Sequence, residues 1–198
     1  MASRQLNMEL TVDRALQTAR QKRYSGFGEM FSVLHMKELV EDLINVEATL
    51  LKDLGRNKSK ILEHLVNGWP LLVPYDADAN HEPARKGGHR AHWAVIIGFC
   101  LLSEEISNGN NLNTLPRGSD LKTKLKNIPD NLLILLAKQG KSRHTKWWSF
   151  DRLFESNRGL QFINPKIGFS ENRLEYVLPE NGNLEESLAD KFLMIKPK

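Results

Sequence analysis

The segment 87–99 shows the strongest strand pattern in the chain, and it places a histidine where that strand begins. Apart from His92, residues 91–99 are small, aromatic or β-branched, which is typical of a strand buried on both faces. Two glycines open the segment and predict the turn that leads into the strand. We therefore expect His92 at the start of a buried strand, on the same face as Ala94 and Ile96.

A histidine in this position supports two interpretations. Packing around the strand can hold the ring rigidly while the ring still reaches a cleft, which is what a general base requires. The alternative is a core histidine whose nitrogens are satisfied by hydrogen bonds, as most buried polar groups are. The residues around His92 leave both interpretations open.

Length and composition predict one domain spanning residues 1–198. A chain of 198 residues with 40% hydrophobic content is long enough to bury one core and short for two. The sequence shows neither an apolar run of about 18 residues nor a signal-peptide pattern, so a cytoplasmic location is expected, with no membrane partner. Its single cysteine, Cys100, cannot form an intramolecular disulfide, and we interpret it as a small buried apolar residue. No cofactor is predicted.

Capping residues and apolar spacing predict an α+β fold, with N-terminal helices packed on a C-terminal antiparallel sheet. Thr11, Ser32 and Ser149 are candidate helix N-caps, and Val66 is expected to face the core. Helices are expected at 11–23, 32–44, 57–68 and 149–156. Strands are expected at 46–51, 70–75, 91–99, 132–137, 145–148, 174–178 and 192–195.

Two further segments have a distinctive composition. Prolines at both ends of 70–74 indicate either that this strand lies near a sheet edge or that the prolines mark its two ends. The segment 103–130 is polar and lacks periodicity, which predicts a long surface insertion.

The net charge of +4 is concentrated in two basic segments, 85–90 and 138–146. This clustering indicates an acidic partner or substrate. Nucleic acid is one such partner, but no aromatic side chains alternate with the basic ones and no nucleic-acid-binding motif is present, so this class is disfavoured.

A metal site is a further alternative, because His81, His89 and His92 lie close in sequence to Asp76 and Asp78. Zinc sites favour tight ligand pairs on rigid elements, whereas two of these imidazoles fall in a polar loop. Hydrogen bonding within the loop is the competing interpretation, since aspartates commonly form turns. We therefore predict no metal.

Several short motifs stand in the order found in one protein family. They are Gly28–Ser32, Pro74–Asp76, Asn80–Pro83, Gly88–His89, Ala91–Val95, Lys138–Ser142 and Glu155–Asn157. Together they resemble the actin maturation proteases, over residues 1 to about 195 and most weakly across 103–130. The resemblance implies a cytosolic cysteine aminopeptidase that removes the acetylated first residue of immature actin, with profilin as a companion of the substrate. It also implies a fold like that of papain-like and bacteriocin-processing peptidases.

The resemblance implies roles for individual residues. His92 would be the general base, and Gln139 would orient its ring through a carboxamide oxygen, the alternative for Gln139 being a water-exposed turn residue. Because the family's substrate begins with carboxylates, a rim of basic residues around the site is expected to bind it. The alternative is that these residues form a solvated basic face. The rim residues are Arg85, Lys86, Arg90, Lys141, Arg143 and Lys146.

The nucleophile departs from the family pattern. In the family, a glutamine and a cysteine open the first helix, and matching that pattern places the cysteine about two helical turns upstream of Met1. Cys100 cannot replace it, because eight residues of strand separate it from His92 by roughly 26 Å. The 198 residues alone are therefore expected to be inactive. The alternative function is a non-catalytic actin-binding or regulatory fragment of the same fold.

Overall fold

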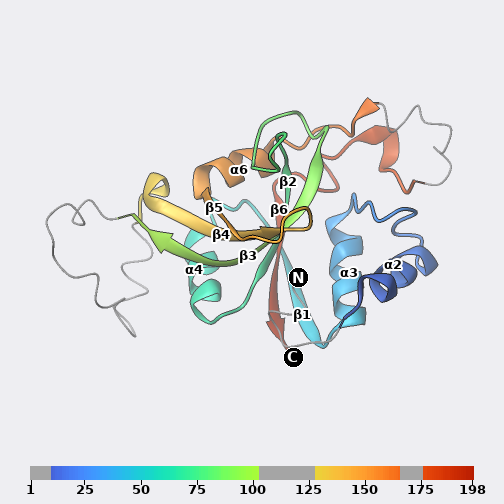
Figure 1. Ribbon diagram of the computed structural model, residues 1–198, viewed down its shortest axis with the longest axis horizontal. Helices are drawn as coiled ribbons and strands as arrows, with labels where there is room; N and C mark the ends of the chain where they lie inside the picture. The colour runs from blue at the N-terminus through green and yellow to red at the C-terminus, as the bar shows by residue number, and fades with distance from the viewer. Residues whose placement is uncertain (1–9, 103–127, 166–175) are drawn as a thin grey trace, which may run out of the picture.

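The computed structural model describes residues 10–102, 128–165 and 176–198, and these form an α+β fold around an antiparallel sheet of six strands (Figure 1). The strands lie in the order β1-β6-β2-β3-β4-β5. They are β1 (Val46–Lys52), β2 (Leu71–Asp76), β3 (Ala91–Leu101), β4 (Leu133–Gln139), β5 (Lys146–Ser149) and β6 (Lys191–Pro197). Most of the 103–130 insertion lies outside the described residues.

Local capping signals set the start of three helices. The side-chain oxygens of Thr11, Ser32 and Ser149 each accept a backbone N–H from the residue three positions later, at 3.2 Å. Each cap satisfies an N–H group that has no partner inside the helix, so all three expected N-caps are confirmed. The α-helices are α2 (Val12–Gln21), α3 (Val33–Leu43), α4 (Lys58–Val66) and α6 (Phe150–Arg158), and the short 3₁₀ helices are η2 (Asp130–Leu132) and η4 (Glu180–Gly182).

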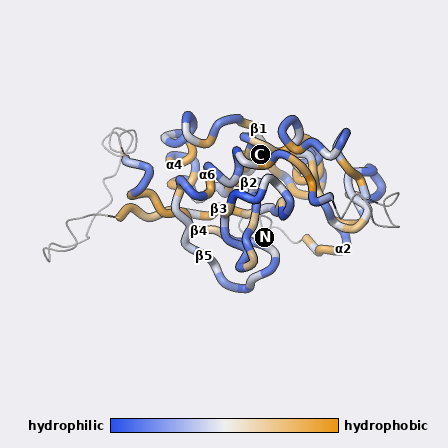
Figure 2. The backbone as a smooth tube through the Cα atoms, turned by 90° about the horizontal axis from the view of Figure 1, so that it is seen from above, coloured by the Kyte–Doolittle hydropathy of each residue, from blue (hydrophilic) through white to orange (hydrophobic). Residues whose placement is uncertain are grey.

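The two faces of the sheet carry separate apolar clusters. On one face, Ile61 of α4 and Leu153 of α6 pack with Ala94 of β3, whereas Val33 of α3 packs with Val95 on the other. Figure 1 accordingly shows α3 beside β1 and α4 away from it, nearer β3. In Figure 2 much of β3 is coloured apolar and the peripheral loops are mainly hydrophilic. Adjacent residues of β3 thus point to opposite faces, as a strand requires.

Of the two explanations for the prolines, placement of β2 near a sheet edge is wrong, because β2 pairs with both β3 and β6. Placement at the strand's ends is right for Pro70, which precedes β2, and wrong for Pro74, which lies within it. Its pairing with β6 covers only Leu71 and Leu72, so Pro74 lies beyond that ladder and its missing N–H removes no bond from it. The Asn157 side chain fills the gap by donating to the Pro74 carbonyl (2.8 Å) and the Lys191 carbonyl (3.0 Å).

Several other expectations are also wrong, each for its own reason. Val66 is 46% exposed because it follows buried Leu65 by one residue, which is about 100° around the helix. Residues 176–178, the described part of the expected strand 174–178, form no strand. Cys100 is partly exposed rather than buried. Helices and strands also alternate along the chain, since β1 precedes α4 and α6 precedes β6, so they do not separate into two blocks. No helix in the described ranges is long and apolar enough to cross a membrane.

Candidate active site

His92 is the second residue of β3 and lies directly opposite Tyr75 of β2, which confirms its expected place at a strand start. Its ring contacts the Tyr75 ring at a centroid distance of 6.2 Å and the His81 ring at 5.4 Å. The Tyr75 side chain is fully buried. A rigid strand and a packed aromatic neighbour therefore fix the position from which the imidazole projects.

Asp76, at the end of β2, organises the loop that leads to His92. Its buried carboxylate accepts the backbone N–H groups of Lys86, Gly88 (2.9 Å) and Arg90 (3.2 Å). The Ser156 hydroxyl on α6 holds Asp76 from the other side, because it accepts the Asp76 N–H and donates to the Asp76 carbonyl. Asp76 therefore fixes the return of the chain into β3, which agrees with loop hydrogen bonding, the alternative to a metal-ligand role.

Gly88 occupies a position that no other residue fits without strain. Its φ is +94°, and a Cβ atom there would lie 2.7 Å from the Phe162 carbonyl oxygen and 2.9 Å from Leu184 Cδ1. The turn expected from the paired glycines is thus confirmed, and close backbone approach explains one of them.

The His92 ring lines a cavity of about 330 Å³. The lining residues are Phe31, His81, Gly88, His89, Arg90, Ala91, His92, Lys141 and Asn164. Within the described residues, the His92 nitrogens make no hydrogen bond. His64 shows the opposite arrangement, because it is only 5% exposed and its Nε2 lies 3.0 Å from the Ile195 carbonyl and 3.2 Å from the Pro70 carbonyl. His92 and His64 thus differ, because the first ring lines a cavity and the second is satisfied by hydrogen bonds in the core.

The surroundings of His92 favour its neutral form. Burial is the largest cause of its lowered pKa, and positive charge on His81, Lys141 and Arg90 lowers the pKa further. Asp76 opposes this shift. A neutral imidazole that opens onto a cavity can accept a proton, which is the first requirement of a general base.

Gln139 ends β4 opposite Ala94, on the strand next to His92. It is 3% exposed, so the alternative of a water-exposed turn residue is wrong. Its Oε1 accepts the backbone N–H of Lys141 at 2.6 Å and thereby closes its own hairpin. The carboxamide oxygen expected to orient His92 is therefore engaged by the turn.

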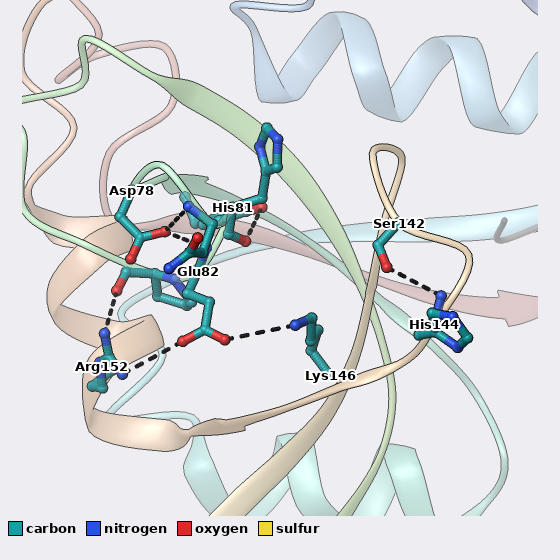
Figure 3. Close-up of polar contacts among 10 residues, drawn as sticks. Asp78, His81, Glu82, Ser142, His144, Lys146 and Arg152 are labelled. Carbon is teal, nitrogen blue, oxygen red and sulfur yellow. Dashed lines mark hydrogen bonds and ion pairs between the residues drawn. The ribbon is translucent and has the colours of Figure 1, made fainter.

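The structure brings two of the six rim residues to the His92 cavity, namely Arg90 and Lys141. Arg85 instead pairs with Glu155 at 3.2 Å. Glu82 lies between Lys146 (3.9 Å) and Arg152 (3.8 Å), as Figure 3 shows. Of the remaining two, Lys86 is exposed on the loop before β3, and Arg143 is exposed on the hairpin between β4 and β5.

The residues weighed as metal ligands separate in the structure. His81, His89 and His92 line one cavity, but Asp76 is directed at backbone N–H groups. Asp78 Oδ1 likewise accepts the N–H groups of Asn80 and Glu82. Hydrogen bonding within the loop therefore accounts for both aspartates, and no group of three or more potential metal-ligating side chains occurs among the described residues.

Known proteins resemble this chain over most of its length. Residues 1–100 match the family model described as "Actin maturation protease-like, C-terminal domain". The chain is 33% identical to the actin maturation protease of Mus musculus, over 96% of this chain and 55% of the relative. It is 34% identical to that of Xenopus tropicalis (100% and 67%) and 37% identical to that of Danio rerio (94% and 63%). The chain belongs to the actin maturation protease family.

This family member spans little more than half the length of the mouse relative. No solved structure matches it. The segments that resemble the actin maturation proteases nevertheless converge around β3. The Trp93 Nε1–H donates to the Met30 carbonyl at 2.8 Å, and α6 contacts β2 through Ser156 and Asn157. Motifs that are far apart in the sequence thus contact β3 or its neighbour β2.

Cys100 lies on β3 opposite Ile134, eight residues beyond His92. β3 runs without interruption between them, apart from a register shift between Ile96 and Gly98. The cysteine and the imidazole therefore sit at opposite ends of one strand, so Cys100 does not serve His92.

Proposed function

We propose that this chain is the histidine-bearing part of a cysteine aminopeptidase that removes the acetylated N-terminal residue of immature actin in the cytoplasm. Membership of the actin maturation protease family supports protease activity in actin maturation. The observation that carries the proposal is the His92 imidazole, which opens onto a cavity and is free of hydrogen bonds within the described residues. A papain-like arrangement of the fold is part of the same proposal.

In this mechanism His92 works with a thiol that none of these 198 residues supplies. The imidazole takes the thiol proton as the sulfur attacks the carbonyl carbon of the scissile bond. The resulting imidazolium then donates that proton to the departing amine, and water releases the acyl group from sulfur. Since Cys100 is at the far end of β3, the nucleophile would come from polypeptide outside this chain.

Arg90 and Lys141 are the proposed substrate contacts nearest to His92, since they line its cavity. They would attract a carboxylate-rich N-terminus and raise its rate of encounter. Arg85, Lys86, Arg143 and Lys146 would contribute from the outer rim. Gln139 is the orienting residue that the family resemblance implies. Its oxygen accepts the Lys141 N–H and has a second lone pair for an imidazole N–H.

A non-catalytic actin-binding fragment is the second candidate function. The separation of Cys100 from His92 favours it, because the described residues place no thiol at the cavity. Such a fragment would bind immature actin through the same basic rim without cleaving it.

Mass spectrometry of actin N-termini distinguishes the two functions. Immature actin is incubated with the 198-residue chain, and with the chain fused behind the N-terminal portion of the mouse relative. We expect only the fusion to release the acetylated residue, and expect H92A in the fusion to abolish release. Full activity of the H92A fusion would refute the role of His92. Actin binding without cleavage by both proteins would establish the second function.

A further inference from the structure

Tyr75, His81 and the candidate base His92 form a closed set of contacts. His92 contacts the rings of Tyr75 and His81, and the Tyr75 hydroxyl donates to the His81 carbonyl at 3.0 Å. Each member therefore touches the other two. His81 comes from the loop after β2, so this closure joins the loop to the strand that bears the base.

The backbone of His81 is fixed in an unusual conformation. Its φ is +59°, in the left-handed region that non-glycine residues rarely adopt. Its N–H donates to the Asp78 carbonyl at 3.2 Å, and its own carbonyl accepts the Tyr75 hydroxyl. Because Tyr75 is fully buried and packs on Trp148 at 4.9 Å, the hydroxyl is a rigid anchor. Strained backbone of this kind persists only where its surroundings hold it.

The side chain of His81 is directed toward His92 and not toward the ion pairs nearby. Figure 3 shows its ring pointing away from Glu82, Lys146 and Arg152. The ring lines the His92 cavity, and its buried Nδ1 has no hydrogen-bond partner among the described residues. The two rings meet at a centroid distance of 5.4 Å and an interplanar angle of 69°, which is an edge-to-face contact.

We propose that His81 is the positioning residue that sets the ring orientation of His92, and that the Tyr75 hydroxyl in turn positions His81. This inference rests on the proposed role of His92 as the base. The His81 ring packs edge-on against the His92 ring and so limits its rotation. Gln139, the other candidate for this task, has its oxygen on the Lys141 N–H.

Nuclear magnetic resonance of the histidine rings in the 198-residue chain tests the proposal without any need for peptidase activity. The ¹⁵N shifts of each ring report its tautomer, and a pH titration reports its protonation. The variants are H81A, H81F, Y75F and Q139A, with H144A at an exposed turn as the matched control. His64, buried in the core, is the internal reporter of folding.

We expect H81A and Y75F to change the His92 tautomer signals, and H81A to shift the His92 titration upward because a neighbouring positive charge is lost. H81F keeps a ring in place without a nitrogen, so it should restore the orientation of His92 but not the titration. Q139A should leave the His92 tautomer signals unchanged, and H144A should change neither the tautomer nor the titration. Unchanged His92 tautomer signals in H81A and Y75F, with His64 intact, would overturn the proposal, as would a change of tautomer caused by Q139A alone. Failure of actin processing would leave these measurements unaffected, so the two hypotheses fail separately.

Discussion

Trp93 donates its indole N–H to the backbone carbonyl of Met30 at 2.8 Å, and this bond joins the loop before α3 to the strand that carries His92. The next residue, Phe31, lines the His92 cavity. One hydrogen bond between segments 63 residues apart thus helps to form the wall of the candidate site.

Replacing Trp93 by phenylalanine should lower the free energy of unfolding by about 1–2 kcal/mol, because the Met30 carbonyl loses its donor. Urea denaturation measures this loss. W147F is the matched control, since Trp147 is 59% exposed on β5 and its replacement should change stability by less than about 0.5 kcal/mol. Equal effects of the two variants would show that the Trp93–Met30 bond contributes nothing.

Alanine at Gly88 should destabilise the protein by about 3 kcal/mol or more, because the added Cβ combines a positive φ with contacts below 3 Å to the backbone at Phe162 and to Leu184. G68A isolates the first effect. Gly68 has a φ of +77° but open space around its Cβ position, so that change should cost only about 1 kcal/mol. Thermal melts of both variants would reveal whether the close approach at Gly88 matters.

Stability should fall as the pH is lowered below about 6.5, the ordinary pKa of histidine. Burial lowers the pKa values of His64 and His92 in the folded state, so the unfolded chain binds more protons in this range. The contribution is complete above pH 6.5 and is lost as the pH falls through the folded pKa. Urea titrations from pH 8 to 5 measure the slope, and H64Q should make it shallower. An unchanged slope in H64Q would exclude His64 as a cause.

Replacing Glu29 by glutamine should lower the free energy of unfolding by about 2–3 kcal/mol. The Glu29 carboxylate accepts the backbone N–H groups of Gly26, Phe27 and Val177 at 2.6–2.8 Å. Burial opposes ionisation here, but these N–H groups outweigh it and lower the pKa of Glu29. Its contribution is therefore present above pH 4.5 and lost as the pH falls through the folded pKa.

Chemical denaturation of E29Q at pH 7 tests this prediction. E186Q, at an exposed position, is the control. A loss in E29Q no larger than that in E186Q would contradict the assignment.

Features determined by neighbouring residues could be predicted from the sequence. The caps at Thr11, Ser32 and Ser149 depend on a backbone N–H three residues away, and the His92 strand depends on its own apolar run. The interior position of β2 could not be predicted in this way, because its second partner is β6, more than a hundred residues later.

The same distinction between local and distant contacts applies to the residues of the candidate site. The position of His92 followed from its strand, but the contacts of Asp76 and His81 depend on how the loop 77–90 folds back. The burial of Gln139 was missed because a polar residue in a turn gives no sign that its own side chain closes that turn. Asp76 did carry a signal of its own, since an acidic residue that ends a strand ahead of Gly87 and Gly88 is well placed to accept backbone N–H groups of that loop.

The place of β6 between β1 and β2 bears on how the protein is made. While the ribosome is synthesising the chain, β1 and β2 emerge long before residues 191–197, and each has an unsatisfied edge until those residues arrive. Until residues 191–197 are synthesised, the nascent chain therefore exposes unpaired edges on β1 and β2, to which chaperones or the strands of another chain could bind.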